Sequence, residues 1–264
     1  MKGHLDLVCA VDADGRSHLS RQSFCAPVHL SKPHWDENAL VVNVVNPTAG
    51  LFAGDHLRYD VAVENRAHLL LTSPSASRAY KMPTGEAVVE QHFQVSDGGL
   101  LEVMPEYFIP QAGCRYRQRT ELEVAQGGSA IFFETLAPGR VAAGEAFDFD
   151  RLEWTTLVRW DGRLVARERY RIEGGESPSL AALRAPFPCA YYLSCLLIGT
   201  SFAELPPPPD QEDFLLGYSR LPENAGWAIR VLARDSIALR RVQRWLREQI
   251  YAGLGLRPPA LRRY

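Results

Sequence analysis

The sequence predicts a mainly β protein whose strands stack in two layers, in a β-helix-like architecture, with a few helices including one near the C-terminus. The first observation is alternation: from about Leu57 to Glu173, apolar residues recur with period two in runs of five to nine residues, bounded by Gly, Asp, Asn and Pro. Such alternation is typical of strands that bury one face. The second observation is an internal repeat within the same region.

Three segments of this region resemble one another. They begin at Val63, Val95 and Val124, which are 32 and 29 residues apart, and each combines a strand end, a small polar turn and an apolar strand. This spacing favours a supersecondary unit stacked on its neighbours over a closed barrel of even hairpins. Ordinary hairpins in a β-sandwich are the alternative interpretation of the same segments.

The composition is that of a globular protein. The chain has 264 residues, with 29 Lys and Arg against 31 Asp and Glu and a formal net charge of −2. A general nucleic-acid binder needs a strongly basic surface, so this balance argues against that class. Hydrophobic residues make up 46% and charged residues 23%, enough apolar material for a conventional core. Because all-β domains of about 200 to 250 residues are common, we expect one β-rich domain over residues 1–264.

We expect a cytoplasmic protein without a membrane span. The N-terminal residues contain no apolar stretch long enough for a signal peptide. The most apolar segment, Cys189–Gly199, falls short of the roughly 20 residues needed to cross a bilayer. The five cysteines show no CxxC spacing, which argues against zinc and redox sites of that type, so we expect reduced and mostly buried thiols.

The longest strand pair is predicted between Arg151 and Glu173. If Trp160–Gly162 form a three-residue loop with Gly162 in the left-handed conformation, Arg159 pairs with Arg163 and even-numbered residues face even-numbered residues. The shared even face is then apolar apart from one carboxylate.

That carboxylate, Glu168, has two counterparts at the centres of predicted strands, Glu102 and Glu134. A carboxylate on an apolar strand face is costly unless it is paired, hydrated or bound to a cation. One interpretation is a salt bridge to an arginine. The other is a water-filled passage whose carboxylates transiently hold a divalent cation. Ligands that are all oxygen favour weak, exchangeable binding of a transition metal.

The C-terminal part of the chain, over about residues 226–252, predicts a strand followed by a helix. Asp235 can cap a helix that reaches about Ala252, with Gly253 as the stop. The apolar stripe of this helix favours packing on the sheet, and its basic side chains could also dock an acidic partner. The candidate partner-binding residues are Arg240, Arg244 and Arg247.

Four segments, in order along the chain, carry a resemblance to a known family. The segment Asn46–Asp55 resembles the NPxGGxxxGD signature of the urease accessory protein family UreD, also called UreH. Three later segments are similar to the family elements LLTTPxAxKxYR, LEWLPQE and GRxxxGExF, and they are Leu70–Lys81, Leu101–Glu106 and Gly139–Phe147. The resemblance is close from about residue 25 to residue 173 and looser over the C-terminal strand and helix.

Within these segments we single out small and charged residues that a loop geometry or a site would need. Ala49 stands where the family has the first glycine of a pair. Glycines permit positive φ, and Asp55 can bond back to loop amides, so this segment fits a structural turn as well as a functional aspartate. The motif residues are Gly50, Gly54, Asp55, Tyr80, Gly139, Arg140, Gly144 and Glu145.

The resemblance implies a non-catalytic scaffold that binds apo-urease and the accessory proteins UreF and UreG and helps deliver nickel to the urease active site. It also implies a two-layer β fold with a few helices and an internal polar passage for nickel. Such a passage gives Glu102, Glu134 and Glu168 a role as transient nickel ligands. The resemblance implies no tightly bound cofactor, and it allows a homodimer within the complex.

Two other classes of function are alternatives to the scaffold. No HExxH, GxSxG, GxxxxGK[ST] or GxGxxG motif occurs, so an enzyme would need a pocket built near Asp55 and Arg140 together with the N-terminal histidines. A ligand-binding β module would use exposed aromatic side chains such as Trp154 or Trp160, but the predicted alternation turns both inward. The scaffold predicts little activity of the chain alone.

Overall fold

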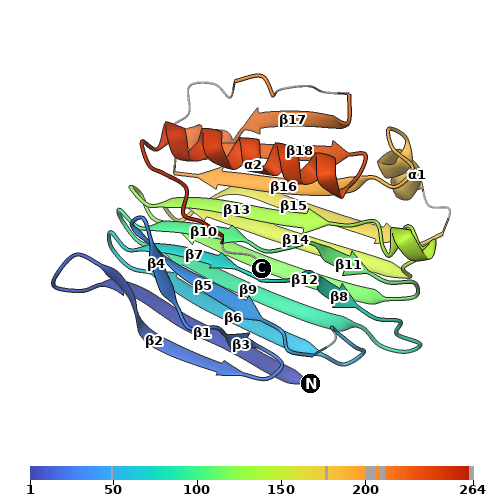
Figure 1. The fold of residues 1–264 in the computed structure, drawn as a ribbon, viewed down its shortest axis with the longest axis horizontal. Coiled ribbons are helices and arrows are strands. Elements are labelled where there is room, and N and C mark those ends of the chain that lie inside the picture. Colours follow the sequence, from blue (N-terminus) through green and yellow to red (C-terminus); the bar gives the residue numbers. More distant parts are fainter. Residues whose placement is uncertain (49, 176–177, 200–205, 209–211, 262–264) are drawn as a thin grey trace.

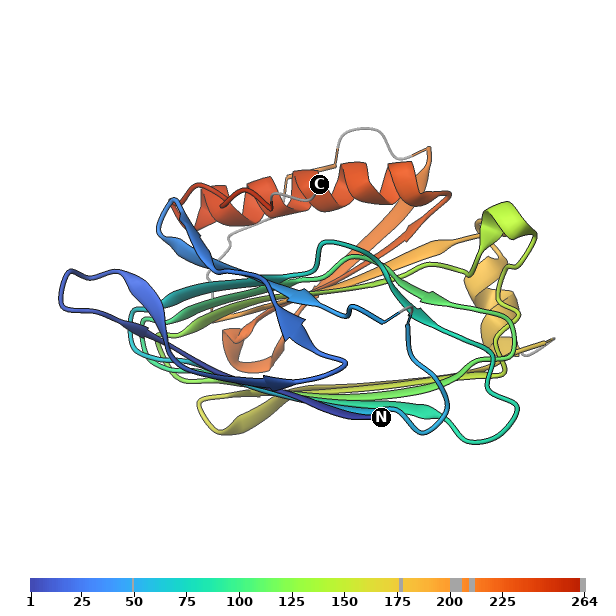
Figure 2. The ribbon, with the colours of Figure 1, turned by 60° about the horizontal axis from the view of Figure 1, so that its bottom comes forward.

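The computed structural model describes residues 1–48, 50–175, 178–199, 206–208 and 212–261. Two β-sheets lie face to face, and one long helix crosses the outer side of the larger sheet (Figure 1; Figure 2). The mainly β prediction is therefore confirmed, with one helix near the C-terminus as expected.

The smaller sheet has seven strands in the order β15-β14-β12-β9-β6-β1-β2. Its five inner strands run parallel, and antiparallel strands occupy both edges. The strands are β1 (Lys2–Val11), β2 (Ser17–Cys25), β6 (His56–Val63), β9 (Ala87–Val95), β12 (Arg115–Val124), β14 (Arg151–Trp160) and β15 (Arg163–Glu173).

The larger sheet has eleven strands, and its central path is β17-β18-β16-β13-β10-β7-β5-β3. The run β5, β7, β10, β13 is parallel, and β16, β18 and β17 follow in antiparallel order. The strands are β3 (His29–Leu30), β4 (His34–Asp36), β5 (Ala39–Val45), β7 (His68–Thr72), β8 (Ser77–Ala79), β10 (Leu100–Met104), β11 (Phe108–Pro110), β13 (Ser129–Leu136), β16 (Tyr191–Ile198), β17 (Phe214–Arg220) and β18 (Gly226–Ala233). The helices are η1 (Val141–Ala143), α1 (Pro178–Arg184), η2 (Pro222–Asn224) and α2 (Ser236–Gly253).

The three repeated segments are successive layers of a β-solenoid-like stack. Each leads from the smaller sheet through a tight turn into the larger one, as β6 to β7, β9 to β10 and β12 to β13. The residues that begin the repeats, Val63, Val95 and Val124, lie beside one another on adjacent parallel strands. The stacked-unit prediction is confirmed, and the alternative of ordinary hairpins in a sandwich is wrong for this region.

The turns of the three repeats share one geometry. In each, an amide donates to the carbonyl three residues earlier, at 3.0 or 3.1 Å. The residue before the donor has a positive φ, and these residues are Arg66, Gly98 and Gly127. Glycine is favoured there because L side chains rarely adopt this conformation. At Gly127 a Cβ would also lie 2.0 Å from the Asp97 carboxylate of the adjacent turn, so a larger residue there would have to displace that side chain.

The hairpin β14–β15 differs from its predicted register by two residues. The loop contains only Asp161 and Gly162, both with positive φ, so Trp160 pairs with Arg163. A bulge after Val158 then shifts the pairing along the rest of the hairpin. A two-residue loop of this kind matches the right-handed twist of the strands, and the bulge keeps the even-numbered residues on one face.

Two apolar cores hold the layers together. One lies between the two sheets and includes the Phe93 and Phe132 rings, whose centroids are 5.5 Å apart. The other includes Leu246 and Ile250 of α2, the helix that Figure 2 shows lying along the larger sheet. The predicted Asp235 cap is confirmed, because its carboxylate accepts from the amides of Ile237 and Ala238. The C-terminal strand and helix therefore pack on the larger sheet, as expected.

The structure also bears on the predictions about the cysteines and a membrane span. All five cysteines are free thiols; Cys9, Cys114 and Cys195 are buried, Cys189 is half-buried and Cys25 is exposed. Within the described residues, no helix is long and apolar enough to cross a membrane.

A buried ion pair ties α2 to the larger sheet. Glu102 is fully buried, and the Arg247 guanidinium donates to both of its oxygens, at 2.5 and 2.8 Å. The Tyr251 hydroxyl donates to the same carboxylate at 2.6 Å. The assignment of Arg247 to a partner-binding face is therefore wrong. Glu102 points away from the space between the sheets, so its assignment to an internal passage is wrong as well.

We expect Arg247→Ala to destabilise the protein by about 3–5 kcal/mol, because the substitution leaves the Glu102 carboxylate buried without its counter-charge. Urea unfolding followed by circular dichroism measures this difference. The matched control is Arg244→Ala on the exposed side of the same helix, which should change stability by less than about 0.5 kcal/mol. Equal effects of the two substitutions would contradict the role of the pair.

Candidate functional site: a polar cavity between the two sheets

The remaining predicted carboxylates, Glu134 and Glu168, both lie between the two sheets. Glu134 is on β13, where its neighbours Phe132 and Leu136 belong to the core between the sheets. Glu168 is on β15 and forms an ion pair with Arg230 of β18, in the opposite sheet. The salt-bridge interpretation thus holds for Glu168, and its partner Arg230 lies in one register row with Glu134, on the other side of Ser194.

Parallel stacking lines up polar residues on the inner face of the smaller sheet. Neighbouring strands contribute one residue each to a single row, and these residues are Tyr59, Gln91, Thr120, Thr156 and Glu168. The larger sheet contributes a second row, formed by Glu134, Ser194 and Arg230. We call these two rows, together with Gln118, the polar seam.

Glu134 is the best-buried charge of the polar seam and only half of its carboxylate is satisfied. Its Oε1 accepts from the Gln118 amide at 2.6 Å and from the Trp154 indole at 2.7 Å. Its Oε2 is buried and has no hydrogen-bond partner among the described residues. A buried acceptor in this state gains free energy from any donor or cation that reaches it.

The environment of Glu134 also brings its protonation equilibrium close to neutral pH. Burial raises the pKa of Glu134 to about 7, although the Trp154 hydrogen bond and the charge of Arg230 both lower it. Small changes around this carboxylate therefore decide whether it is charged. A carboxyl group of this kind can bind a cation when it loses its proton and release the cation when it regains it.

A cavity leads from the surface to Glu134. Its volume is about 330 Å³, room for several water molecules. Near the surface it is lined by polar residues of the resemblance segments, including Asn46, Thr48, Ser73 and Arg78. Deeper in, it is lined by aromatic residues and by the polar seam as far as Gln118 and Glu134.

The glycine-rich segment and the Tyr80 segment together build the mouth of this cavity. Gly50 has a φ of +156°, and a Cβ there would lie 2.6 Å from the Arg78 carbonyl and 2.8 Å from the Tyr80 ring. The Tyr80 amide donates to the Leu51 carbonyl at 2.9 Å, and the Tyr80 ring stacks on Phe52. Gly50 and Tyr80 therefore shape the mouth through close packing.

Asp55 closes a turn behind the mouth. It is buried, it accepts from the Phe52 amide at 2.8 Å, and it pairs with the N-terminal amine of Met1. Gly54 before it has a φ of +80°. The structural-turn interpretation of this segment is the one that the geometry supports.

Arg140 and Glu145 close a second loop by an ion pair, and the Arg140 hydrogen bond lowers the pKa of Glu145. Gly139 and Gly144 have φ values of +146° and +78°, and a Cβ on Gly139 would lie 2.9 Å from the Glu145 carbonyl. Neither Asp55 nor Arg140 lines the cavity that reaches Glu134. The structure thus gives a loop-closing role to these residues and places the polar pocket elsewhere.

One exposed basic residue of α2, Arg240, lies close to the mouth of the cavity. Arg240 pairs with Glu106 at 3.2 Å, and its guanidinium lies over the Tyr107 ring. Glu106 itself lines the cavity. Arg244 is exposed on the same helix. Docking of an acidic partner on Arg240 and Arg244 stays a prediction.

Sequence reasoning missed Gln91, Gln118 and Arg230, which complete the polar seam. Each is a polar residue at a position where alternation calls for an inward side chain. Uncharged polar residues and arginines at such positions are a weaker signal than carboxylates, because burying them costs less free energy or is easily relieved by hydrogen bonds. Alternation does not tell whether an inward residue faces the core between the sheets or the core beneath α2, because that depends on how the sheets are arranged.

Comparisons with known proteins give the same family as the four sequence segments. The family model described as UreD urease accessory protein matches residues 1–264. A urease accessory protein UreD from Opitutus terrae is 42% identical over 259 residues, which cover 93% of this chain and 92% of the relative. The protein of the same name from Deinococcus radiodurans is 32% identical over 269 residues, covering 99% of this chain and 94% of the relative.

The raised pKa of Glu134 makes stability depend on pH in a defined direction. Its folded-state pKa of about 7 lies above the ordinary value of 4.5. The contribution to folding is fully present below pH 4.5 and is lost as the pH rises through about 7. We expect Glu134→Gln, which stays neutral, to match the wild type near pH 4.5 and to exceed its stability at pH 8 by up to about 3 kcal/mol.

Urea unfolding of both proteins at a series of pH values measures this difference. Glu248→Gln, at an exposed position on α2, is the control and should show no such rise. A stability difference between Glu134→Gln and the wild type that is the same at every pH would contradict the assignment.

Proposed function

Because the chain belongs to the UreD family of urease accessory proteins, we propose that it acts as a non-catalytic scaffold in the cytoplasmic maturation of urease. In this role it binds apo-urease together with the accessory proteins UreF and UreG, and it assists the insertion of nickel into the urease active site. Nickel is the cargo of this process, and the chain holds it only transiently.

The observation that carries this proposal is the cavity that ends at Glu134. Its mouth is built from the segments that resemble the family signature, and its inner end holds a carboxylate with one oxygen that no described residue hydrogen-bonds. Beyond Glu134 the polar seam continues to Arg230 and Glu168, whose side chains are 28% and 21% exposed. Polar groups thus extend from one opening toward a second, partly exposed end.

The chemistry of these groups suits a cargo that must be released. A single carboxylate with amide and hydroxyl neighbours offers oxygen ligands only, which hold a divalent transition metal weakly. A pKa near 7 at Glu134 lets a proton compete with the cation. Arg230 adds a positive charge beside the carboxylates, and its ion pair with Glu168 must open or shift for a cation to pass.

The C-terminal elements carry exposed side chains that would suit contact with partners. Large apolar side chains are exposed on β17 and at the start of α2, and these are Leu215, Tyr218 and Ile237. Exposed apolar groups of this kind, next to basic residues such as Arg240, are typical of protein–protein contact. A small-molecule enzyme is the alternative, and catalysis by the purified chain alone would support it.

The scaffold role is tested by co-expressing the affinity-tagged chain with the matching urease subunits, UreF and UreG. We expect urease and UreF to be retained with the tag, and nickel-dependent urease activity to require the chain. The control is the same expression without the chain. Failure to retain either protein, combined with activation that does not need the chain, would overturn the proposal.

The passage is tested within the same system by Glu134→Gln and Glu168→Gln. Both variants keep the size of the side chain but lose the negative charge that a cation needs, so we expect urease activation to fall by about tenfold or more. Pull-down of UreF and the unfolding temperature report on assembly and folding. Glu90→Gln on the outer face of the smaller sheet is the control and should activate urease normally.

A further inference from the structure

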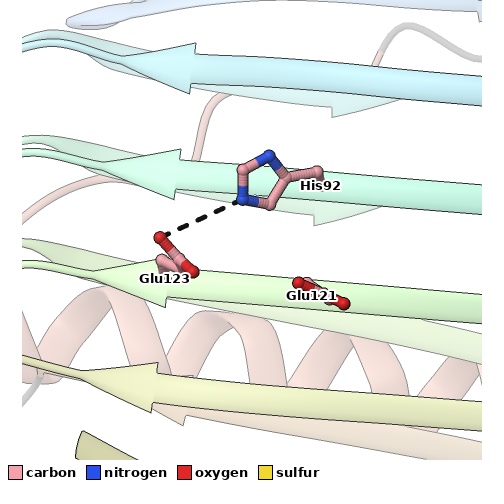
Figure 3. A group of neighbouring side chains, drawn as sticks. All are labelled: His92, Glu121 and Glu123. Atoms are coloured by element: carbon pink, nitrogen blue, oxygen red, sulfur yellow. Dashed lines mark ion pairs between the residues drawn. The ribbon is translucent and has the colours of Figure 1, made fainter. Parts of the chain in front are cut away.

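A second group of metal-ligating side chains lies on the opposite face of the smaller sheet, outside the polar seam. His92 of β9 and Glu121 of β12 lie beside each other in the parallel register. Glu123 follows two residues later on the same strand and therefore projects from the same face. Figure 3 shows the three side chains on adjacent strands, with the Glu123 carboxylate directed toward the His92 ring.

The ligand atoms of this group are close enough to share one ion. One nitrogen or oxygen from each of the three residues lies within 4.8 Å of the others. The His92 Nε2 and the Glu123 Oε2 are 4.0 Å apart. Since metal–nitrogen and metal–oxygen bonds in proteins are about 2.0 to 2.2 Å, an ion placed between these two atoms can contact both.

The other side of the His92 ring faces a carboxylate as well. Asp60 of β6 is in register with His92, and its Oδ1 lies 3.9 Å from the His92 Nδ1. This separation is longer than a hydrogen bond, and Arg58 donates to both oxygens of the Asp60 carboxylate, at 2.7 and 3.1 Å. The contact with His92 is therefore electrostatic only, and the His92 Nε2 on the other side of the ring faces Glu123.

The neighbouring Arg119 contacts Glu121 but does not prevent the three side chains from binding a cation. Arg119 donates twice to Glu121, at 2.6 and 2.9 Å, and both bonds are to Oε1. The contact therefore orients the Glu121 side chain and leaves Oε2 for a cation. The three side chains stand on central strands of a sheet, and strands hold ligands more rigidly than loops do.

We propose that His92, Glu121 and Glu123 form a surface site for a divalent transition-metal cation. One imidazole nitrogen and two carboxylate oxygens favour such an ion over Mg²⁺ or Ca²⁺, which prefer oxygen ligands alone. Half-buried ligands leave the remaining coordination positions to water, so the ion exchanges readily. Assigning the ion as nickel rests on the proposed function, whereas the site itself rests on the geometry of these residues.

Binding of Ni²⁺ alone to the full chain, measured by isothermal titration calorimetry, tests the site. We expect His92→Gln and Glu123→Gln each to weaken Ni²⁺ binding by about tenfold or more. His56→Gln is the matched control, because His56 lies on the same face and pairs with Glu90 at 2.8 Å but belongs to no three-residue group in the described part of the chain. It should bind Ni²⁺ like the wild type.

Two results would overturn the site: absence of Ni²⁺ binding to the wild type, or binding by His92→Gln that equals that of the wild type and of His56→Gln. Glu123→Gln provides the same test if His92→Gln does not fold. Urease activation distinguishes the two proposals. If only the surface site is wrong, activation still requires the chain and Glu134; if the scaffold role is wrong, activation is independent of the chain whatever the calorimetry shows.

Discussion

The constraint on which the rest of the structure depends is the register of the parallel strands. Corresponding residues of successive repeats lie side by side, so the three turns and the inward apolar positions are repeated along the stack. One polar residue at an inward position becomes a row when its neighbours are also polar, as for Gln91, Thr120 and Thr156. The outer face obeys the same rule, and Asp60, His92 and Glu121 lie in one line there.

Two buried glutamates show how neighbours decide the role of the same side chain. Glu102 meets a guanidinium and a phenol that satisfy both of its oxygens, and it holds α2 in place. Glu134 meets an amide and an indole that satisfy only one oxygen, beside a cavity. A fully paired charge is a fixed structural element, whereas a half-paired charge beside solvent is suited to binding and release.

The sequence was sufficient to predict the stacked strands and the Asp235 cap, because alternation, turn chemistry and capping are local signals. It was insufficient to separate Glu102 from Glu134. Both sit at the centre of an apolar strand, but one faces α2 and the other faces the second sheet. The hairpin register was also missed, since a bulge after Val158 leaves no clear trace in the alternation.

The antiparallel strands at both edges of the smaller sheet set a limit on its growth. A stack of parallel layers can in principle accept another layer from a neighbouring molecule, because each free edge offers unpaired backbone groups. Here β2 and β15 reverse direction and carry charged side chains such as Arg21 and Arg169, each already engaged with an acidic neighbour on β1 or β14. The chain thus terminates its own repeat, which counters end-to-end fibre formation by copies of itself.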